Sequence, residues 1–193
     1  MHFELAPDPD FPVPAGVRLR ILGKDDISLL VDHLKSLDAA SLRDRFNGVT
    51  SLSWVEDYAR RCIRPGTLVL AAEADGSVVG VAELHPAGAD SAELAFSVSE
   101  AWRGRGVGAA LFALIVEAAW SRGLDSIEIT TQSGNDAMKK LARRFGTELR
   151  FDTGETFGKI SLAEMHMLDQ FGNKRSWTPQ AQSRRSSQKR KAD

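Results

Sequence analysis

The stretch SVSEAWRGRGVGAALFALIVEAA, residues 97–119, decides the fold of this chain. A strand is expected to end near Ser99, a short turn carries three glycines, and a long amphipathic helix begins at Val107. Glycine has no Cβ, so the backbone N–H groups of such a turn can converge on one point. The first N–H groups of the helix have no partner inside it and lie at the positive end of its dipole. With Arg103 and Arg105 beside them, these groups predict a pyrophosphate site.

The same glycines are compatible with other phosphate-binding loops. Gly104-x-Gly106-x-x-Ala109 formally fits the dinucleotide fingerprint. That motif needs a strand running straight into the first glycine and an acid that ends a second strand about 20 residues later. Here residues 100–103 intervene, and Asp125 precedes a strand instead of ending one. A Walker loop is excluded because no Gly-Lys-Ser/Thr follows, which leaves a glycine-rich helix start without a ligand as the remaining alternative.

Apolar periodicity and turn residues predict the elements on both sides of this stretch. They are, in order, a strand at 17–22, a helix with apolar residues from 27 to 37, a helix over 52–62, strands at 68–74, 78–84 and 92–99, the helix from 107 to 123, a strand at 127–130, a helix over 135–145, and strands near 148–152 and 157–165. The turn Asp75-Gly76-Ser77 indicates an antiparallel hairpin. Antiparallel strands followed by a β-α-β-α-β stretch predict an α+β fold with a central mixed, mostly antiparallel sheet and helices on both faces.

Composition limits the class of protein. The chain has 193 residues, 42% hydrophobic and 26% charged, which is typical of one globular domain. No apolar run is long enough to cross a bilayer, and the N-terminal residues lack the pattern of a secretory signal, so we expect a cytoplasmic protein. The single cysteine, Cys62, excludes an internal disulfide framework and a multi-cysteine zinc site.

Both ends of the chain differ from its body. Residues 1–16 contain four prolines and one glycine, all after position 6, which predicts an extended arm that does not pack against the domain. Residues 17–171 form the single predicted domain. Residues 172–193 carry seven of the 25 Lys and Arg but one of the 26 Asp and Glu, so they hold a net +6 and the remainder −7. We expect this basic tail to be disordered and dispensable for catalysis. Binding of a nucleic acid or an acidic partner is the rival interpretation of this tail, and no such partner is expected through the acidic body.

The run AELAFSVSEAWRGRGVGAALF resembles the acetyl-CoA-binding core of the GNAT N-acetyltransferase superfamily. Its signature Arg/Gln-x-x-Gly-x-Gly/Ala reads here Arg103 to Gly108, and the resemblance extends in order over 17–165. In that family the loop amides hold the cofactor pyrophosphate, while the preceding strand and an Asn before the next helix contact the pantetheine arm. The resemblance therefore implies that acetyl-CoA is the cosubstrate. The implied binding residues are Phe96, Ser97, Val98, Arg103, Gly104, Arg105, Gly106, Val107, Gly108, Ala109 and Asn135.

Within the superfamily, the likeness is nearer to bacterial protein-lysine acetyltransferases. The segment SLRDRFNG resembles their Ser-x-x-x-Arg-Phe element, and Asn-x-x-Met-x-x-Leu-Ala resembles their core. The implied activity is direct transfer of acetyl from acetyl-CoA to a primary amine, a protein lysine, in a ternary complex. Two alternatives stay open: an enzyme that acetylates a small amine or a ribosomal protein terminus, and a non-catalytic acyl-CoA sensor. The sequence leaves the acceptor and the oligomeric state undecided.

Amine acetylation needs a base, because an ammonium group is not a nucleophile. Glu93 is the expected base, since its strand leads into the glycine-rich loop. Strand alternation places Glu93, Ala95 and Ser97 on one face. Glu83 and His85 share a face of the neighbouring strand and are the alternates, although an ordinary sheet-face role is the simpler interpretation of those two.

Other residues are expected to have structural roles. Many superfamily members place a Tyr acid where this chain has Ala142, so no protein acid is identified. The single tyrosine, Tyr58, is predicted on a helix face, and Cys62 is predicted buried, which disfavours a ping-pong mechanism. The segment with Arg43, Arg45 and Phe46 is read as a packed, solvated loop in preference to a substrate mouth. The histidines lack ligand-like spacing, so we expect no metal site; they are His2, His33, His85 and His166.

Overall fold

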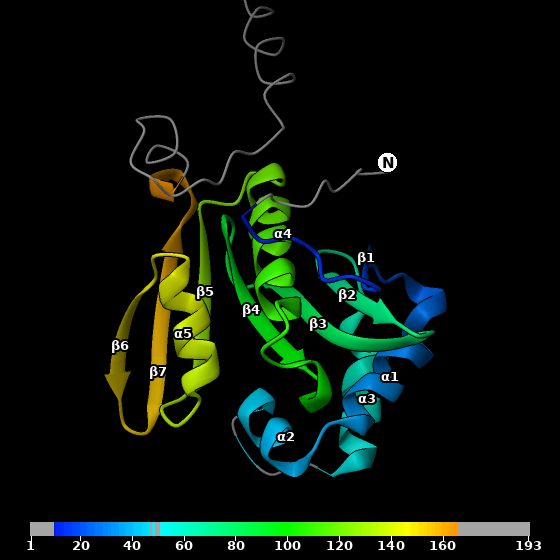
Figure 1. Ribbon diagram of the computed structural model, residues 1–193. Coiled ribbons are helices and arrows are strands. Elements are labelled where there is room, and N and C mark those ends of the chain that lie inside the picture. The colour runs from blue at the N-terminus through cyan, green and yellow to red at the C-terminus, as the bar shows by residue number, and fades with distance from the viewer. Residues whose placement is uncertain (1–9, 47, 49–50, 166–193) are drawn as a thin grey trace, which may run out of the picture.

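The computed structural model describes residues 10–46, 48 and 51–165 (Figure 1). Its strands are β1 (Arg18–Ile21), β2 (Leu68–Ala74), β3 (Ser77–Pro86), β4 (Ser91–Val98), β5 (Ser126–Gln132), β6 (Glu148–Asp152) and β7 (Glu155–Ser161). Its α-helices are α1 (Ile27–Ser36), α2 (Ala39–Phe46), α3 (Leu52–Cys62), α4 (Val107–Ser121) and α5 (Asp136–Arg144), with short 3-10 turns η1 (Lys24–Asp26) and η2 (Glu100–Trp102). The predicted order of elements is confirmed, and α2 is an addition in a segment that was expected to be a loop.

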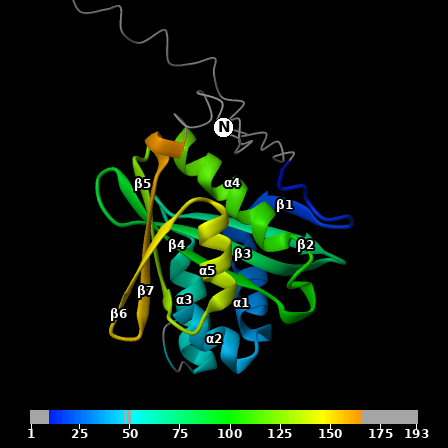
Figure 2. The same ribbon diagram turned by 60° about the vertical axis from the view of Figure 1, so that its left-hand side comes forward.

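The seven strands form one sheet in the order β1-β2-β3-β4-β5-β7-β6. Within it, β4 and β5 pair in parallel and the other neighbours pair antiparallel. Helices α4 and α5 cover one face of the sheet, α1 and α3 cover β2 and β3 on the other, and α2 lies across the lower end (Figures 1 and 2). The mixed, mostly antiparallel α+β fold is therefore confirmed.

Two apolar cores hold these layers together. The larger one packs α4 and α5 on the sheet, and the smaller one packs α1 and α3 on the opposite face of β2 and β3. Strands β2 and β3 are buried on both faces, which explains their continuous apolar runs LVLAA and VVGVA. Gly80 lets α4 approach closely, because a Cβ there would lie 3.1 Å from side-chain atoms of both Val107 and Leu111.

The parallel pairing of β4 with β5 is short. It covers Ser91 to Leu94 on β4 and Ser126 to Ile129 on β5. Beyond these residues the two strands diverge, so the last half of β4 has a backbone edge that β5 does not occupy (Figure 1). This opening leads directly to the glycine-rich turn, which positions the candidate site.

Three expectations need correction. Helix α4 is apolar on nearly all sides instead of amphipathic, because it lies between the sheet and neighbouring elements. The last strand ends at Ser161 and is followed by helical backbone over 162–165. The described part of the N-terminal arm is packed: the ring of Phe11 stacks on Phe145 with centroids 4.5 Å apart. Aromatic stacking outweighs the extended character that its prolines predict.

No helix in the described ranges combines the length and apolar character needed to cross a membrane. The basic tail, His2 and His166 lie outside the described residues, so the predictions made for them stay predictions.

Candidate functional site

The glycine-rich turn presents exposed backbone at the start of α4. Gly104 and Gly106 have φ values of +70° and +93°, in the left-handed region that favours glycine. Gly106 is the N-cap of α4 and offers no side-chain cap. Ala110 is the first residue whose N–H bonds a carbonyl of this turn, at 3.0 Å from the Gly106 oxygen. The N–H groups ahead of it have no acceptor inside the helix and suit an anion.

The space in front of the turn differs from one glycine to the next. A Cβ on Gly104 would meet nothing within 4 Å, whereas one on Gly106 would meet Pro14 Cγ at 3.7 Å. A Cβ on Gly108 would meet the ring of Phe96 at 3.5 Å. Gly104 therefore lines open space, and the other two glycines are covered in part by the protein itself. A side chain at position 104 would project into this open space.

Arg103, the first residue of the motif, connects the turn to α2. Its Nε donates to the carbonyl of Val98 at 3.2 Å, and its Nη2 bonds Ser41 Oγ and lies 3.4 Å from Asp38 Oδ2. Arg105 extends over the ring of Trp102, 5.1 Å from its centroid. The structure thus places both arginines at the turn, as expected, but the Arg103 side chain is engaged by protein groups.

Side chains along the free edge of β4 alternate between the two faces of the sheet, as predicted. Ser97 is buried and its Oγ lies 2.9 Å from His33 Nε2, on the α1 side of the sheet. Phe96 points to the other side, where its ring lies 6.4 Å from that of Phe112. Burial lowers the pKa of His33 to about 4, because the charged imidazolium is poorly solvated there. This neutral His33 fixes β4 to α1 just ahead of the turn.

Asn135 lies at the start of α5, near the end of β5. Its Oδ1 accepts from the N–H of Met138 at 3.0 Å, and its Nδ2 donates to Thr131 Oγ1 at 3.0 Å. The side chain is an N-cap that fixes the beginning of the helix. About two helical turns further on, Ala142 is fully buried in the larger core, so it offers no polar group to the site.

Glu93 lies where β4 and β5 begin to part. Its side chain is exposed, and its Cα pairs with His85 of β3 on one side and Glu128 of β5 on the other. Glu128 pairs in turn with Lys159 of β7. These side chains share the sheet face opposite α5. Among the described elements α2 contacts β4 and β5, and no other helix covers that face over β5, β7 and β6 (Figure 2).

The two alternates differ sharply in environment. Glu83 is completely buried and accepts from three donors at Oε2: Tyr58 Oη at 2.5 Å, Cys62 Sγ at 3.0 Å and His85 Nε2 at 3.0 Å. Its Oε1 lies 2.8 Å from Arg45 Nη2. Although burial opposes ionisation, Arg45 and these donors hold the pKa of the Glu83 carboxyl well below its usual range. Glu83 is therefore a carboxylate whose oxygens are already bonded to other side chains, which makes it a poor base. The side chain of His85, by contrast, is 19% exposed.

This polar cluster was not anticipated from the sequence. Arg45 belongs to α2 and has a side chain only 7% exposed, so it does not solvate a loop; Arg43 is exposed, and Phe46 packs edge-on against Tyr58 at 5.0 Å. Tyr58 lies on α3, as predicted, and its hydroxyl points inward at Glu83. A hint was available, because Glu83 stands inside an apolar strand and a buried carboxylate needs a cationic partner.

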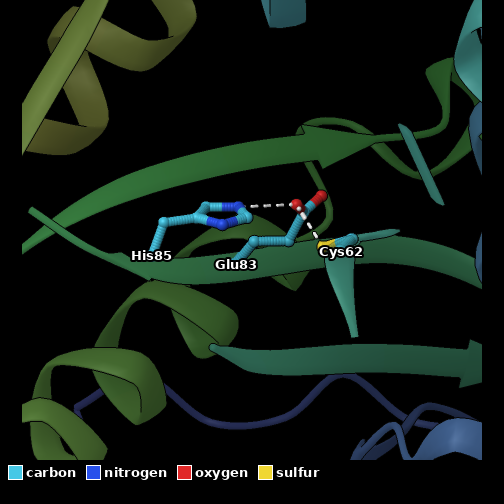
Figure 3. Close-up of side chains that lie close together, drawn as sticks. All are labelled: Cys62, Glu83 and His85. Atoms are coloured by element: carbon cyan, nitrogen blue, oxygen red, sulfur yellow. Dashed lines mark hydrogen bonds and ion pairs between the residues drawn. The ribbon is translucent and has the colours of Figure 1, made fainter. Parts of the chain in front are cut away.

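A metal ion is a second interpretation of the same cluster. Cys62 Sγ, one Glu83 oxygen and a ring nitrogen of His85 lie within 4.8 Å of one another (Figure 3). However, burial raises the pKa of the Cys62 thiol, and the nearby carboxylate adds to that shift, so the metal-binding thiolate is disfavoured. The Arg45 guanidinium already neutralises Glu83. The donor set therefore fits a hydrogen-bonded carboxylate better than a divalent cation, and Cys62 is buried as predicted.

Comparison with known proteins agrees with this arrangement. The model of the acetyltransferase (GNAT) family matches residues 36–147, more than half of the chain. Similar solved structures include the GNAT domain of S. lividans PAT, with a TM-score of 0.65 and 23% identity over 79% of this chain and 98% of that chain. Ribosomal-protein-alanine N-acetyltransferase from Brucella melitensis gives 0.56 and 24% over 75% and 99%. PaiA N-acetyltransferase from Thermoplasma acidophilum, in complex with coenzyme A, gives 0.59 and 17% over 75% and 98%. At these identities the solved structures support the fold.

Proposed function

The chain belongs to the acetyltransferase (GNAT) family and is an acetyl-CoA-dependent N-acetyltransferase, and from this premise we propose direct acetyl transfer to the side-chain amine of a protein lysine. One observation carries the proposal. Strand β4 runs from exposed Glu93, along an edge that β5 leaves free, into the glycine-rich turn. In this proposal the base, a free strand edge and the anion site follow one another along a single strand.

The pyrophosphate of acetyl-CoA would lie on the turn. Open space at Gly104, the left-handed backbone of Gly104 and Gly106, and the uncapped start of α4 all suit a phosphate oxygen. The remaining contacts of this proposal come from Arg103, Arg105, Val107, Gly108 and Ala109 around the turn, from the edge of Phe96, Ser97 and Val98, and from Asn135 beside the opening.

Glu93 would act as the general base. In the proposed reaction it removes a proton from the acceptor ammonium, directly or through one water, and the neutral amine attacks the thioester carbonyl. The C–N bond forms, the C–S bond breaks, and the second amine proton leaves with the thiol of CoA. A direct transfer is supported because Cys62, the single cysteine, is buried and hydrogen-bonded to Glu83.

A cationic acceptor is supported by the charges around Glu93. Glu93 and Glu128 are neighbours in register on the uncovered face, and both side chains are exposed. Two carboxylates side by side repel each other, and an approaching ammonium group relieves that repulsion. An uncovered sheet face also gives a folded protein substrate access to the site. A polyamine is the second candidate acceptor because the same pair of carboxylates suits it.

Replacing Glu93 by Gln tests the proposal, with Glu128→Gln as the matched control. Both variants remove one negative charge from the same face. We expect Glu93→Gln to lower kcat by roughly two orders of magnitude, the usual scale for a positioned base, and to leave acetyl-CoA affinity unchanged. Glu128→Gln should raise KM for a cationic acceptor and leave kcat nearly unaltered.

The assay measures CoA release with lysine-containing proteins, polyamines and small amines as acceptors. The effect of Glu93→Gln should shrink as the pH rises, because more of the acceptor amine is then neutral in solution. Transfer to small amines alone would reject the protein-lysine acceptor. Full activity of Glu93→Gln at neutral pH would move the role of base to another residue.

A further inference from the structure

The buried carboxylate of Glu83 joins three elements behind the proposed acceptor face. Arg45 comes from α2, Tyr58 and Cys62 from α3, and His85 from β3 itself. Figure 3 shows the imidazole of His85 and the thiol of Cys62 directed at the same carboxylate oxygen. Leaving this charge unpaired in the interior would be costly, so Arg45 supplies the opposite charge and the other three residues donate hydrogen bonds to Glu83.

Counting protons in this cluster assigns the tautomer of His85. Glu83 is an anion and accepts only, so His85 Nε2, 3.0 Å away, must donate to it. Tyr58 Oη, 2.5 Å from the same oxygen, has a single proton and uses it there. Arg45 Nη2 donates to Tyr58 Oη at 2.7 Å, which satisfies the phenol oxygen. In the neutral ring the proton of His85 is therefore on Nε2, and Nδ1 carries the lone pair.

The second ring nitrogen of His85, Nδ1, is not used in these contacts. Nδ1 has no hydrogen-bond partner within residues 10–46, 48 and 51–165, and the His85 side chain is 19% exposed to solvent. Glu93 is directly opposite on β4. Directly opposed residues in an antiparallel pair have Cβ atoms about 5 Å apart, so the two side chains are neighbours on the same face of the sheet. The charged or titratable groups around His85 are thus Glu83, Arg45, Tyr58, Cys62 and Glu93.

We propose that Glu83 is a positioning residue of the transfer reaction, and that His85, which it orients, passes the acceptor proton from Glu93 to solvent. This inference rests on the proposed function of Glu93. The proton taken from the ammonium group moves from the Glu93 carboxyl to Nδ1 of His85, which becomes an imidazolium. Solvent then removes that proton, and both groups return to their starting forms. Tyr58 and Arg45 help to hold Glu83 in the position that orients His85, because Tyr58 donates a hydrogen bond to the Glu83 carboxylate and Arg45 forms an ion pair with it.

Kinetics of four variants test the relay. We expect His85→Ala to lower kcat roughly tenfold with little change in KM, less than Glu93→Gln does, because water still accepts part of the proton flux. Free imidazole in the assay should restore much of that loss. The double variant Glu93→Gln/His85→Ala should be no slower than Glu93→Gln alone, since the two groups act on one proton in series.

Glu83→Gln keeps the size of the side chain and removes its charge. It should lower kcat about as much as His85→Ala does, and imidazole should restore its activity too. Cys62→Ala is the matched control, because it removes another donor to the same Glu83 oxygen and leaves the bond from His85. Its kcat should equal that of the unaltered enzyme. Thermal melting of each variant shows whether the fold survives.

The tautomer can be measured on the unaltered protein, so the proposal does not depend on whether Glu83→Gln folds. Long-range ¹H–¹⁵N spectra of ¹⁵N-labelled enzyme should show His85 protonated on Nε2, identified by the signal lost in His85→Ala. His33 is the internal contrast, because its Nδ1 lies 3.0 Å from the Val78 carbonyl and must donate to it. A proton on Nδ1 of His85 would overturn the assignment.

The outcomes separate the two proposals. An active enzyme that is slowed by Glu93→Gln but unaffected by His85→Ala refutes the relay alone. Additive losses in the double variant, or no effect of imidazole, refute it as well. No acetyl transfer to any amine refutes the proposed function, and the spectra then still test whether Glu83 orients His85.

Discussion

Protonation of the buried His33 should weaken the fold as the pH falls. Its Nδ1 donates to the Val78 carbonyl and its Nε2 lies 2.9 Å from Ser97 Oγ, so the neutral ring ties α1 to β3 and β4. Burial lowers its pKa to about 4, while nearby Glu83 raises the pKa and Arg45 lowers it by smaller amounts. An unfolded histidine titrates near pH 6.5.

The sign and size of the effect follow from these two values. Between pH 6.5 and 4 the unfolded chain binds a proton at this site and the folded chain does not, so stability is lost as the pH falls. Above about pH 6.5 the contribution is complete, and below about pH 4 the loss levels off because the folded state is protonated too. The difference of about 2.5 pH units corresponds to a loss of about 3 kcal/mol.

Urea unfolding of the unaltered protein and of His33→Gln, between pH 7.5 and 4, measures this contribution. Gln cannot titrate, so the variant should be less stable at pH 7.5 and should approach the unaltered protein by about 3 kcal/mol on going to pH 4. Carboxylates titrate in both proteins and cancel in the comparison. A constant difference between the two curves across this range would refute the argument.

Two further predictions concern the glycine-rich turn and the C-terminal segment. Gly104 and Gly76 have φ values of +70° and +75°, and a Cβ on either would meet nothing within 4 Å, so Ala at each position should cost roughly 1 kcal/mol of stability. Only Gly104→Ala should weaken acetyl-CoA binding, by about tenfold or more, in calorimetric titrations; equal affinities would place the pyrophosphate elsewhere. Deleting residues 172–193 should leave kcat toward a small amine within about twofold and reduce salt-sensitive retention on DNA. A large loss of activity in the truncated enzyme would contradict the expectation that this segment is dispensable.

Local patterns explain why so much of the fold was predictable. The Asp75-Gly76 turn has positive φ at both residues, as the two-residue loop of a β-hairpin prefers. Strict alternation placed Ser97 on the same face as Glu93, and its contact with His33 confirms that face. The glycine-rich turn was readable for the same reason, since the geometry it needs is encoded by residues within a few positions of one another.

The polar cluster was not predictable in this way. Arg45 lies 38 positions before Glu83, and nothing near it in the sequence indicates that its side chain is buried. The polar segment that includes it lacks a clear apolar face, so it was expected to be a loop, although it forms α2. Phe11 is a similar case, because its neighbours predict an extended arm, whereas the distant ring of Phe145 and the guanidinium of Arg144 hold it in place. Burial of an isolated polar or aromatic residue depends on tertiary partners, which local patterns do not contain.

Helix α2 explains how the two halves of the proposed site are aligned. At its start, Ser41 and the preceding Asp38 bond Arg103 of the glycine-rich motif. At its end, Arg45 pairs with Glu83 of the polar cluster. Ser41 and Arg45 are separated by one helical turn, about 6 Å along the axis, so a short rigid element fixes the glycine-rich turn relative to the residues beside Glu93. The helix that local patterns failed to predict therefore connects the predicted glycine-rich turn to the polar cluster, which they also failed to predict.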